Sequence, residues 1–111
     1  MPAVTTRDTA KRDLIEHYVY LFENAGEHTA DRFLCNAEGS FNDLAEQPMI
    51  GSLLALRHPD LAGLRKWRVK DFENFLIFYF PRPDGVSVVR VLHSAQDWWH
   101  EFGVTAKIAS K

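Results

Sequence analysis

The sequence predicts an α+β fold, in which a short N-terminal strand and a helical hairpin pack on a mainly antiparallel sheet of three to four strands. Two observations carry this prediction. Apolar residues recur at helical spacing over the first half of the 111-residue chain, and three strand-like runs follow one another in the second half. Segregation of helices and strands along a chain is typical of α+β proteins.

The first half is expected to form the strand and the hairpin. Residues 3–5 read as a short strand, and Thr6 or Asp8 is placed to cap the helix that follows. Gly26 ends this helix, and a second helix runs from residue 28 or 29 to Glu46. The apolar residues expected on the buried sides are Leu14, Tyr18, Leu21, Phe22 and Ala25 in the first helix, and Ala30, Phe33, Leu34, Ala37, Phe41, Leu44 and Ala45 in the second.

The second half is expected to form a three-stranded meander, after a connector over residues 47–63 that is broken by proline and glycine. The strands are predicted at residues 64–69, 74–80 and 86–92. The middle run is almost wholly apolar, which is typical of a central strand covered on both faces or across its pleat. Asp84-Gly85 supplies a hairpin turn before the last strand. A short C-terminal helix is expected over residues 93–102.

Composition favours one globular domain over residues 1–111, with residues 103–111 as a flexible tail. Apolar residues make up 46% of the chain and charged residues 25%, which is ordinary for a folded protein. No apolar run is long enough for a membrane span or a secretory signal, so we expect a cytoplasmic protein. The single cysteine, Cys35, lies within an apolar helical pattern and is expected to be a buried thiol.

The sequence predicts neither a metal site nor a cofactor. The five histidines, at positions 17, 28, 58, 93 and 100, form no pairs at the spacing of metal ligands. Phosphate-binding glycine loops and nucleophile motifs are also absent from the sequence.

The charged residues are distributed unevenly, although the net charge is only −2. Residues 1–56 contain four Lys or Arg against nine Asp or Glu, whereas residues 57–90 contain seven against four. The strand-rich half is therefore basic and the helical half acidic. This polarity indicates a face that meets an acidic partner, either protein or nucleic acid. The alternative is a solvated sheet edge of mixed charge.

Several short motifs follow one another along the chain: Ala10 to Leu14, Leu44-Ala45-x-x-Pro48-x-x-Gly51, Gly63-Leu64-Arg65, the strand from Phe72 to Tyr79, Asp84-Gly85-Val86 and Arg90-Val91-Leu92-His93. Their order and spacing resemble the toxins of bacterial type II toxin–antitoxin pairs in the ParE/RelE superfamily, and they are closest to the ParE branch. The resemblance spans about residues 3–97. It implies a RelE/ParE-like fold and a cognate, ParD-like or similar antitoxin, with which the chain would form a hetero-oligomer.

The superfamily uses one fold for two activities. RelE-like members are ribosome-dependent endonucleases that cut messenger RNA, whereas ParE-like members poison DNA gyrase. RNA cleavage needs a base, an acid and cations at the phosphate, and Arg65, Lys66, Arg68, Arg90 and His93 are candidates for these roles. RelE-like nucleases usually carry an arginine in the middle strand, where this chain has Leu76. The resemblance therefore favours a gyrase poison that acts by binding.

The candidate site follows from this interpretation. We predict no catalytic residue and expect a groove between the hairpin and the sheet to accept an extended or helical antitoxin segment. The residues predicted to contact gyrase or the antitoxin are Arg65, Arg68, Arg90, His93, Trp98 and Trp99.

Structural roles for these residues stay open as alternatives. The alternative for Arg65 and Arg90 is that they pair with acidic groups. The alternative for His93 is a structural hydrogen bond. The alternative for Trp98 and Trp99 is that they close the core. Two other functions also stay open: a RelE-type ribonuclease, and an attenuated toxin that only binds its antitoxin. The latter would explain Gln96, because the ParE branch often has arginine at this position.

Overall fold

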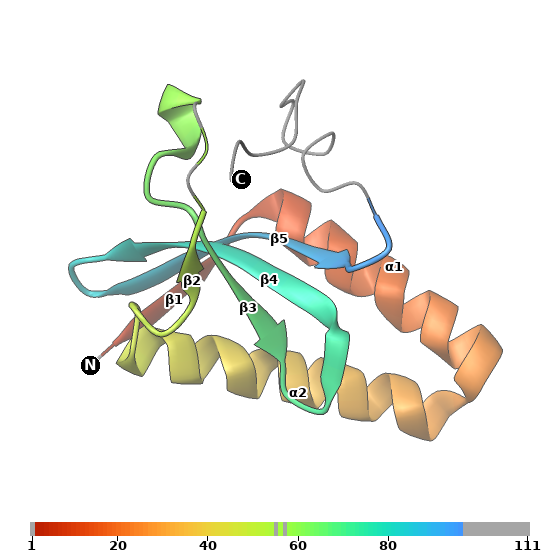
Figure 1. The fold of residues 1–111 in the computed structure, drawn as a ribbon. Helices are drawn as coiled ribbons and strands as arrows, with labels where there is room; N and C mark the ends of the chain where they lie inside the picture. The colour runs from red at the N-terminus through yellow and green to blue at the C-terminus, as the bar shows by residue number, and fades with distance from the viewer. Residues whose placement is uncertain (1, 55, 57, 97–111) are drawn as a thin grey trace.

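The computed structural model describes residues 2–54, 56 and 58–96, and Figure 1 shows a helical hairpin lying against one sheet. The strand predicted at residues 3–5 and the two helices are present, and the three strands of the meander follow them. The C-terminal helix predicted over residues 93–102 lies largely outside the described residues, as does the tail at 103–111. The elements are β1 (Ala3–Thr6), α1 (Asp8–Ala25), α2 (Glu27–Glu46), β2 (Ser52–Leu53), a 3-10 turn (Pro59–Leu61), β3 (Arg65–Val69), β4 (Phe72–Arg82) and β5 (Gly85–His93).

The described sheet has five strands in the order β1-β5-β4-β3-β2, rather than the three to four that we predicted. β1 is parallel to β5, and the other neighbours are antiparallel. The strand that the prediction missed is β2, whose two residues pair with Arg65 and Lys66. A two-residue strand contains no alternation of apolar and polar residues, so the sequence pattern could not reveal it.

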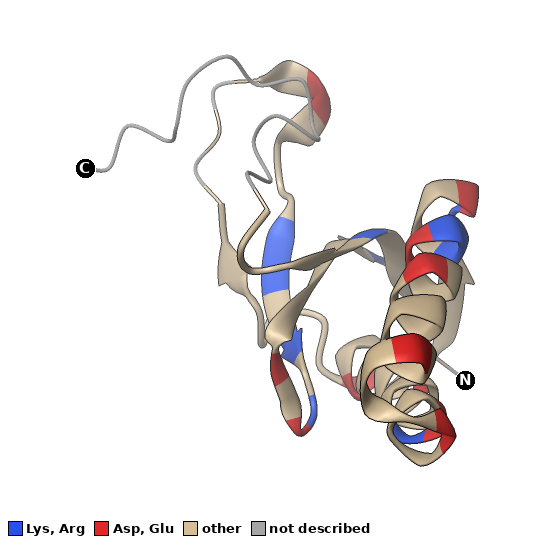
Figure 2. Cartoon of the chain, turned by 90° about the vertical axis from the view of Figure 1, so that its right-hand side faces the viewer, with Lys and Arg blue, Asp and Glu red and all other residues tan. Residues whose placement is uncertain are grey.

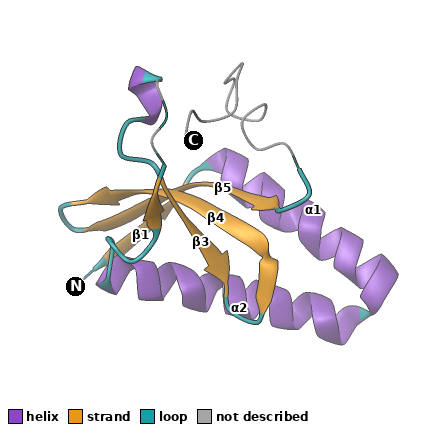
Figure 3. Ribbon diagram, in the orientation of Figure 1, coloured by secondary structure: helices purple, strands orange, loops and turns teal. Residues whose placement is uncertain are grey.

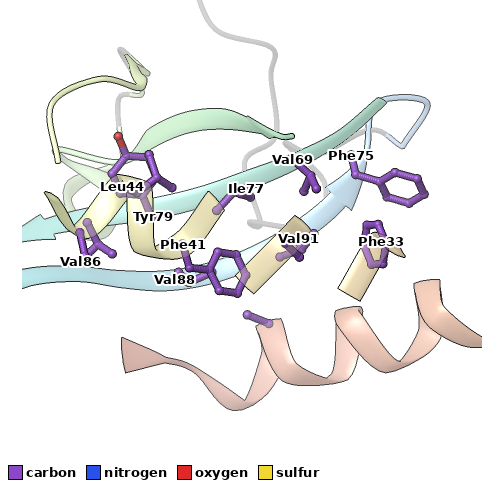
Figure 4. Close-up of a cluster of buried hydrophobic side chains, with 13 residues drawn as sticks. Phe33, Phe41, Leu44, Val69, Phe75, Ile77, Tyr79, Val86, Val88 and Val91 are labelled. Atoms are coloured by element: carbon purple, nitrogen blue, oxygen red, sulfur yellow. The ribbon is translucent and has the colours of Figure 1, made fainter. Parts of the chain in front are cut away.

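Both helices cover the same face of the sheet (Figure 3), and two hydrophobic clusters lie on its two faces. Alternate residues of β4 enter different clusters, because successive side chains of a strand point to opposite faces. The prediction that the middle strand is covered on both faces is therefore confirmed. The first cluster, between hairpin and sheet (Figure 4), contains Ala10, Phe33, Ala37, Phe41, Leu44, Ala45, Val69, Phe75, Ile77, Tyr79, Val86, Val88 and Val91. The second contains Leu54, Leu61, Leu64, Phe78, Phe80, Val89 and Leu92.

The buried face of α2 matches the prediction, except that Leu34 is only half-buried. The prediction for Cys35 was wrong, because this residue is exposed. Phe33 and Ala37 face the core, and a residue two positions from Phe33 is rotated by about 200° around a helix. The apolar neighbours of Cys35 in the sequence therefore do not imply that it shares their face.

The buried face of α1 is rotated from the predicted one. Leu14 and Leu21 pack on the first cluster, but Phe22 is 47% exposed and Ala25 is exposed as well. The predicted caps are also wrong, because Arg7 is the N-cap and makes no side-chain capping hydrogen bond. Thr6 belongs to β1, which pairs with β5 up to Val88 and so fixes where the helix begins.

Ser40 joins α2 to the turn between β3 and β4. Its buried hydroxyl donates to the Asn36 carbonyl at 2.8 Å and accepts the Lys70 N–H at 3.0 Å. We expect Ser40→Ala to lower the free energy of unfolding by about 1–2 kcal/mol, because the Lys70 N–H loses its acceptor. Urea denaturation measures this change. Ser94→Ala, at an exposed serine, is the control, and equal effects of the two substitutions would contradict the role of Ser40.

Candidate partner-binding surface

Arg90 is held by an ion pair with α1. Its Nε donates to Asp13 Oδ2 at 2.7 Å, and its terminal nitrogen donates to Oδ1 at 2.9 Å. The Asp13 side chain is 7% exposed and that of Arg90 is 18% exposed, so this bidentate pair is largely shielded from water. Arg90, which we predicted as a contact for gyrase or the antitoxin, is thus engaged within the protein.

Asp13 is the centre of a polar row on α1 that covers one edge of β5. β1 pairs with β5 only as far as Val88. Beyond that point Thr9 Oγ1 donates to the Val89 carbonyl at 2.8 Å, the Val91 N–H donates to Asp13 Oδ2 at 2.9 Å, and His17 Nε2 lies 2.7 Å from the Val91 carbonyl. These side chains recur every fourth residue and so lie on one helix face. They supply the hydrogen bonds that a longer β1 would have made.

Arg65 also makes hydrogen bonds within the protein, to the segment that follows α2. Its guanidinium donates to the Gly51 carbonyl at 2.6 Å and to the Met49 carbonyl at 3.3 Å. The Tyr79 hydroxyl donates to the Pro48 carbonyl at 2.7 Å and accepts the Gly51 N–H at 2.9 Å. Arg65 and Tyr79 together therefore hold the Pro48–Gly51 segment against the sheet.

Tyr79 is fully buried, and burial raises the pKa of its phenol above the ordinary value of 10.0. The hydrogen bond from Gly51 and the charge of Arg65 act in the opposite direction but are weaker. The neutral phenol is the form that can donate to the Pro48 carbonyl. The phenol is neutral at neutral pH in any case, and the raised pKa extends this form into more alkaline solution.

Arg68 is the exposed cation of β3. Its guanidinium lies 4.4 Å from the centre of the Trp67 ring, and its Nε is 4.0 Å from a carboxylate oxygen of Glu73. Both charged side chains of this pair are more than half exposed, so water screens the pair and it contributes little to stability. Lys66 and Lys70 lie beside Arg68 on the same part of the chain. Arg68 is thus the predicted binding residue that is best placed to reach a partner.

His93 ends β5 and forms a tight turn with Gln96. Its backbone N–H donates to the Gln96 side-chain oxygen at 2.7 Å, and its Nδ1 accepts the Ala95 N–H at 3.0 Å. The His93 ring also packs edge-on against Phe75, with the ring centres 5.0 Å apart. Gln96, the residue that departs from the ParE pattern, caps this turn with its side chain.

The predicted binding residues do not meet at one point. Arg68 is aligned with Leu76, which packs against the second cluster, whereas the ring of His93 contacts Phe75 of the first cluster. The side chains of Arg68 and His93 therefore lie on opposite faces of the sheet. Trp98 and Trp99 lie outside the described residues.

The expected groove between the hairpin and the sheet is filled by the first cluster. Large helix side chains such as Phe33 and Phe41 occupy that space, because the hairpin has no other apolar layer against which to pack. The hollows lie at the margins instead. One of about 250 Å³ lies between α2 and β3 and is lined by Asp43, Trp67, Arg68 and Lys70 among others.

Acidic residues predominate on the helices and basic residues on the strands, although each group contains both. Figure 2 shows red carboxylate residues along the helices and blue basic residues on the strands.

Within the described chain, no group of three His, Cys, Asp or Glu is arranged to hold a metal ion. No described helix is long and apolar enough to cross a membrane.

The structural roles of several residues that shape this surface escaped the sequence prediction. Asp13, Tyr79 and Gln96 act through backbone groups that lie far away in the sequence or across a turn. The spacing of Thr9, Asp13 and His17 was the available signal, because a polar residue every fourth position within an amphipathic helix marks a polar contact in an otherwise apolar interface.

The architecture is that of the RelE/ParE-like toxins. The fold is similar to a solved chain described as "Chromosomal ParDE TA system from P. aeruginosa", with a TM-score of 0.67 and 15% sequence identity, covering 84% of this chain and 96% of that chain. A comparison with curated proteins gave no match. Residues 4–98 match the family described as "ParE toxin of type II toxin-antitoxin system, parDE", and the chain therefore belongs to the ParE toxin family.

Proposed function

We propose that this toxin acts by binding DNA gyrase in the cytoplasm, and that a cognate antitoxin neutralises it by binding in turn. Membership of the ParE family supports this proposal, and the similar solved chain is described as part of a ParDE system. The cations on and beside β3, namely the exposed Arg68 and Lys70 and the half-buried Lys66, are available for acidic side chains of the antitoxin.

One observation favours binding over RNA cleavage: the candidate catalytic groups are dispersed. Cleavage through the 2′-hydroxyl requires a base, an acid and cations within reach of one phosphate. In the described chain Arg65 and Arg90 bond to internal groups, and His93 and Arg68 serve opposite faces of the sheet. The sequence position at which RelE-like nucleases usually carry arginine is Leu76, which packs beside the second cluster.

Gln96 favours a second candidate, an attenuated toxin that only binds its antitoxin. The Gln96 side chain is used to cap the turn at His93, so it is not free to act as a target contact in this conformation. An attenuated toxin would bind the antitoxin and leave gyrase unaffected.

Purified toxin should inhibit supercoiling by purified gyrase and increase the amount of the cleaved DNA–gyrase complex. Added antitoxin should reverse both effects. A parallel assay of messenger RNA cleavage during translation tests the RelE-type activity. Cleavage that disappears with Arg65→Ala or His93→Ala, together with unaffected gyrase, would overturn the proposal. Antitoxin binding without either activity would identify an attenuated toxin.

A further inference from the structure

The outer face of α1 exposes a stripe of large apolar side chains. Ile15 is 64% exposed, Val19 46% and Phe22 47%. Their spacing of four and then three residues places them in one line along the helix. This stripe points away from the sheet, because Ala10 and Asp13 are the buried residues of the same helix.

A hollow between the two helices continues this stripe toward α2. It has a volume of about 250 Å³ and a predominantly apolar lining formed by Leu14, Ile15, Tyr18, Asp31 and Leu34. The Tyr18 hydroxyl donates to the Asp31 carboxylate at 2.8 Å across it, so the hollow has a fixed polar border. Stripe and hollow together form one surface, which we call the hairpin face. An apolar surface of this kind with a polar rim is typical of a protein contact site.

The rim of the hairpin face is acidic. Glu16 and Glu23 flank the stripe on α1, and Glu27, Asp31 and Glu38 lie along α2; all five are exposed. Lys11 and Arg12, one turn before Ile15, are the cations nearest to the stripe in the sequence of α1. Helices α1 and α2 together contain nine carboxylates against three Lys or Arg. Figure 2 shows this excess of acidic residues on the helices.

The negative charge of the hairpin face indicates which kind of partner it binds. Gyrase binds DNA, and a protein that binds this polyanion carries basic surfaces. An acidic antitoxin segment, by contrast, would be repelled by the hairpin face and attracted to the basic side of the sheet. We propose that the hairpin face is the surface with which this toxin contacts gyrase, at a basic surface of the enzyme, while the antitoxin binds the sheet side. This inference rests on the proposed function.

Two substitutions test the inference with separate readouts for gyrase and for the antitoxin. Ile15→Lys places a cation in the centre of the hairpin face, and Glu23→Lys reverses a charge on its rim. Both residues are exposed, so the fold should be retained. We expect each variant to inhibit gyrase at least about tenfold more weakly, since like charges then face each other. The cognate antitoxin should bind both variants within about twofold of wild type.

Two control variants locate the effect. Tyr20→Lys adds the same charge to α1 at a residue that is 60% exposed but lies outside the stripe, and it should leave gyrase inhibition nearly unchanged. Arg68→Glu on β3 should weaken antitoxin binding. Added salt should reduce inhibition by the wild type more steeply than inhibition by Glu23→Lys. The reason is that salt screens the attraction between opposite charges, and Glu23→Lys has already lost part of that attraction.

The results separate this inference from the proposed function. Unchanged gyrase inhibition by Ile15→Lys and Glu23→Lys would overturn the inference and leave the gyrase target standing. Loss of antitoxin binding in the same variants would reassign the hairpin face to the antitoxin and also overturn it. If the wild-type toxin does not inhibit gyrase at all, the proposed function fails and the inference fails with it.

Discussion

Replacing Asp13 by alanine should lower the free energy of unfolding by about 3–5 kcal/mol. The carboxylate accepts two hydrogen bonds from Arg90 and one from the Val91 N–H, in a site where its side chain is 7% exposed. The substitution removes the Asp13 carboxylate, which is a bidentate acceptor for a shielded guanidinium and an acceptor for a strand N–H. Chemical denaturation followed by circular dichroism measures the loss, which is a large part of the stability of a domain of this size.

Two further variants separate the ion pair from the general effect of losing a charge. Arg68→Ala removes an exposed cation whose pair with Glu73 spans 4.0 Å, and it should change stability by less than about 1 kcal/mol. The double variant Asp13→Ala with Arg90→Ala should be more stable than the sum of the single losses indicates, because the two single variants each lose the same Asp13–Arg90 interaction. Strictly additive losses would mean that the Asp13–Arg90 pair is not the source of the effect.

The fold could be predicted largely because its elements are long and periodic. α2 shows its core face through Phe33, Ala37 and Phe41, and β4 shows its central place through an unbroken apolar run. The pattern failed where tertiary contacts override periodicity. Phe22 fits the apolar spacing of α1 but is exposed, while Asp13, a charged residue, is turned inward by its bonds to β5.

The candidate site was less predictable, since a sequence does not show which charges are already paired. Arg65, Arg68 and Arg90 are equivalent by residue type, yet only the structure distinguishes them. Arg65 bonds to backbone carbonyls, Arg90 to a carboxylate, and Arg68 faces solvent with a weak pair. The distinction depends on contacts between residues 14 to 77 positions apart, which no local pattern contains.

Tyr79→Phe tests whether the segment after α2 depends on one buried hydroxyl. We expect a loss of about 2–4 kcal/mol in the free energy of unfolding, because the Gly51 N–H and the Pro48 carbonyl both lose their partner. Amide exchange at Gly51 should become faster than in the wild type. Gly51→Ala should have a similar effect, since a Cβ there would lie 2.5 Å from the Tyr79 hydroxyl oxygen and 2.8 Å from the Lys66 carbonyl oxygen.

The pH dependence provides a second test of the same hydroxyl. Burial raises the pKa of Tyr79 in the folded state, so its contribution to stability is complete below the ordinary tyrosine value of 10.0 and decreases as the pH rises through the folded-state pKa. The stability difference between wild type and Tyr79→Phe should therefore shrink in alkaline solution. Tyr20→Phe, at a tyrosine that is 60% exposed, should be nearly neutral. A Tyr79→Phe difference that stays constant above pH 10 would show that burial does not hold the phenol neutral in the folded state.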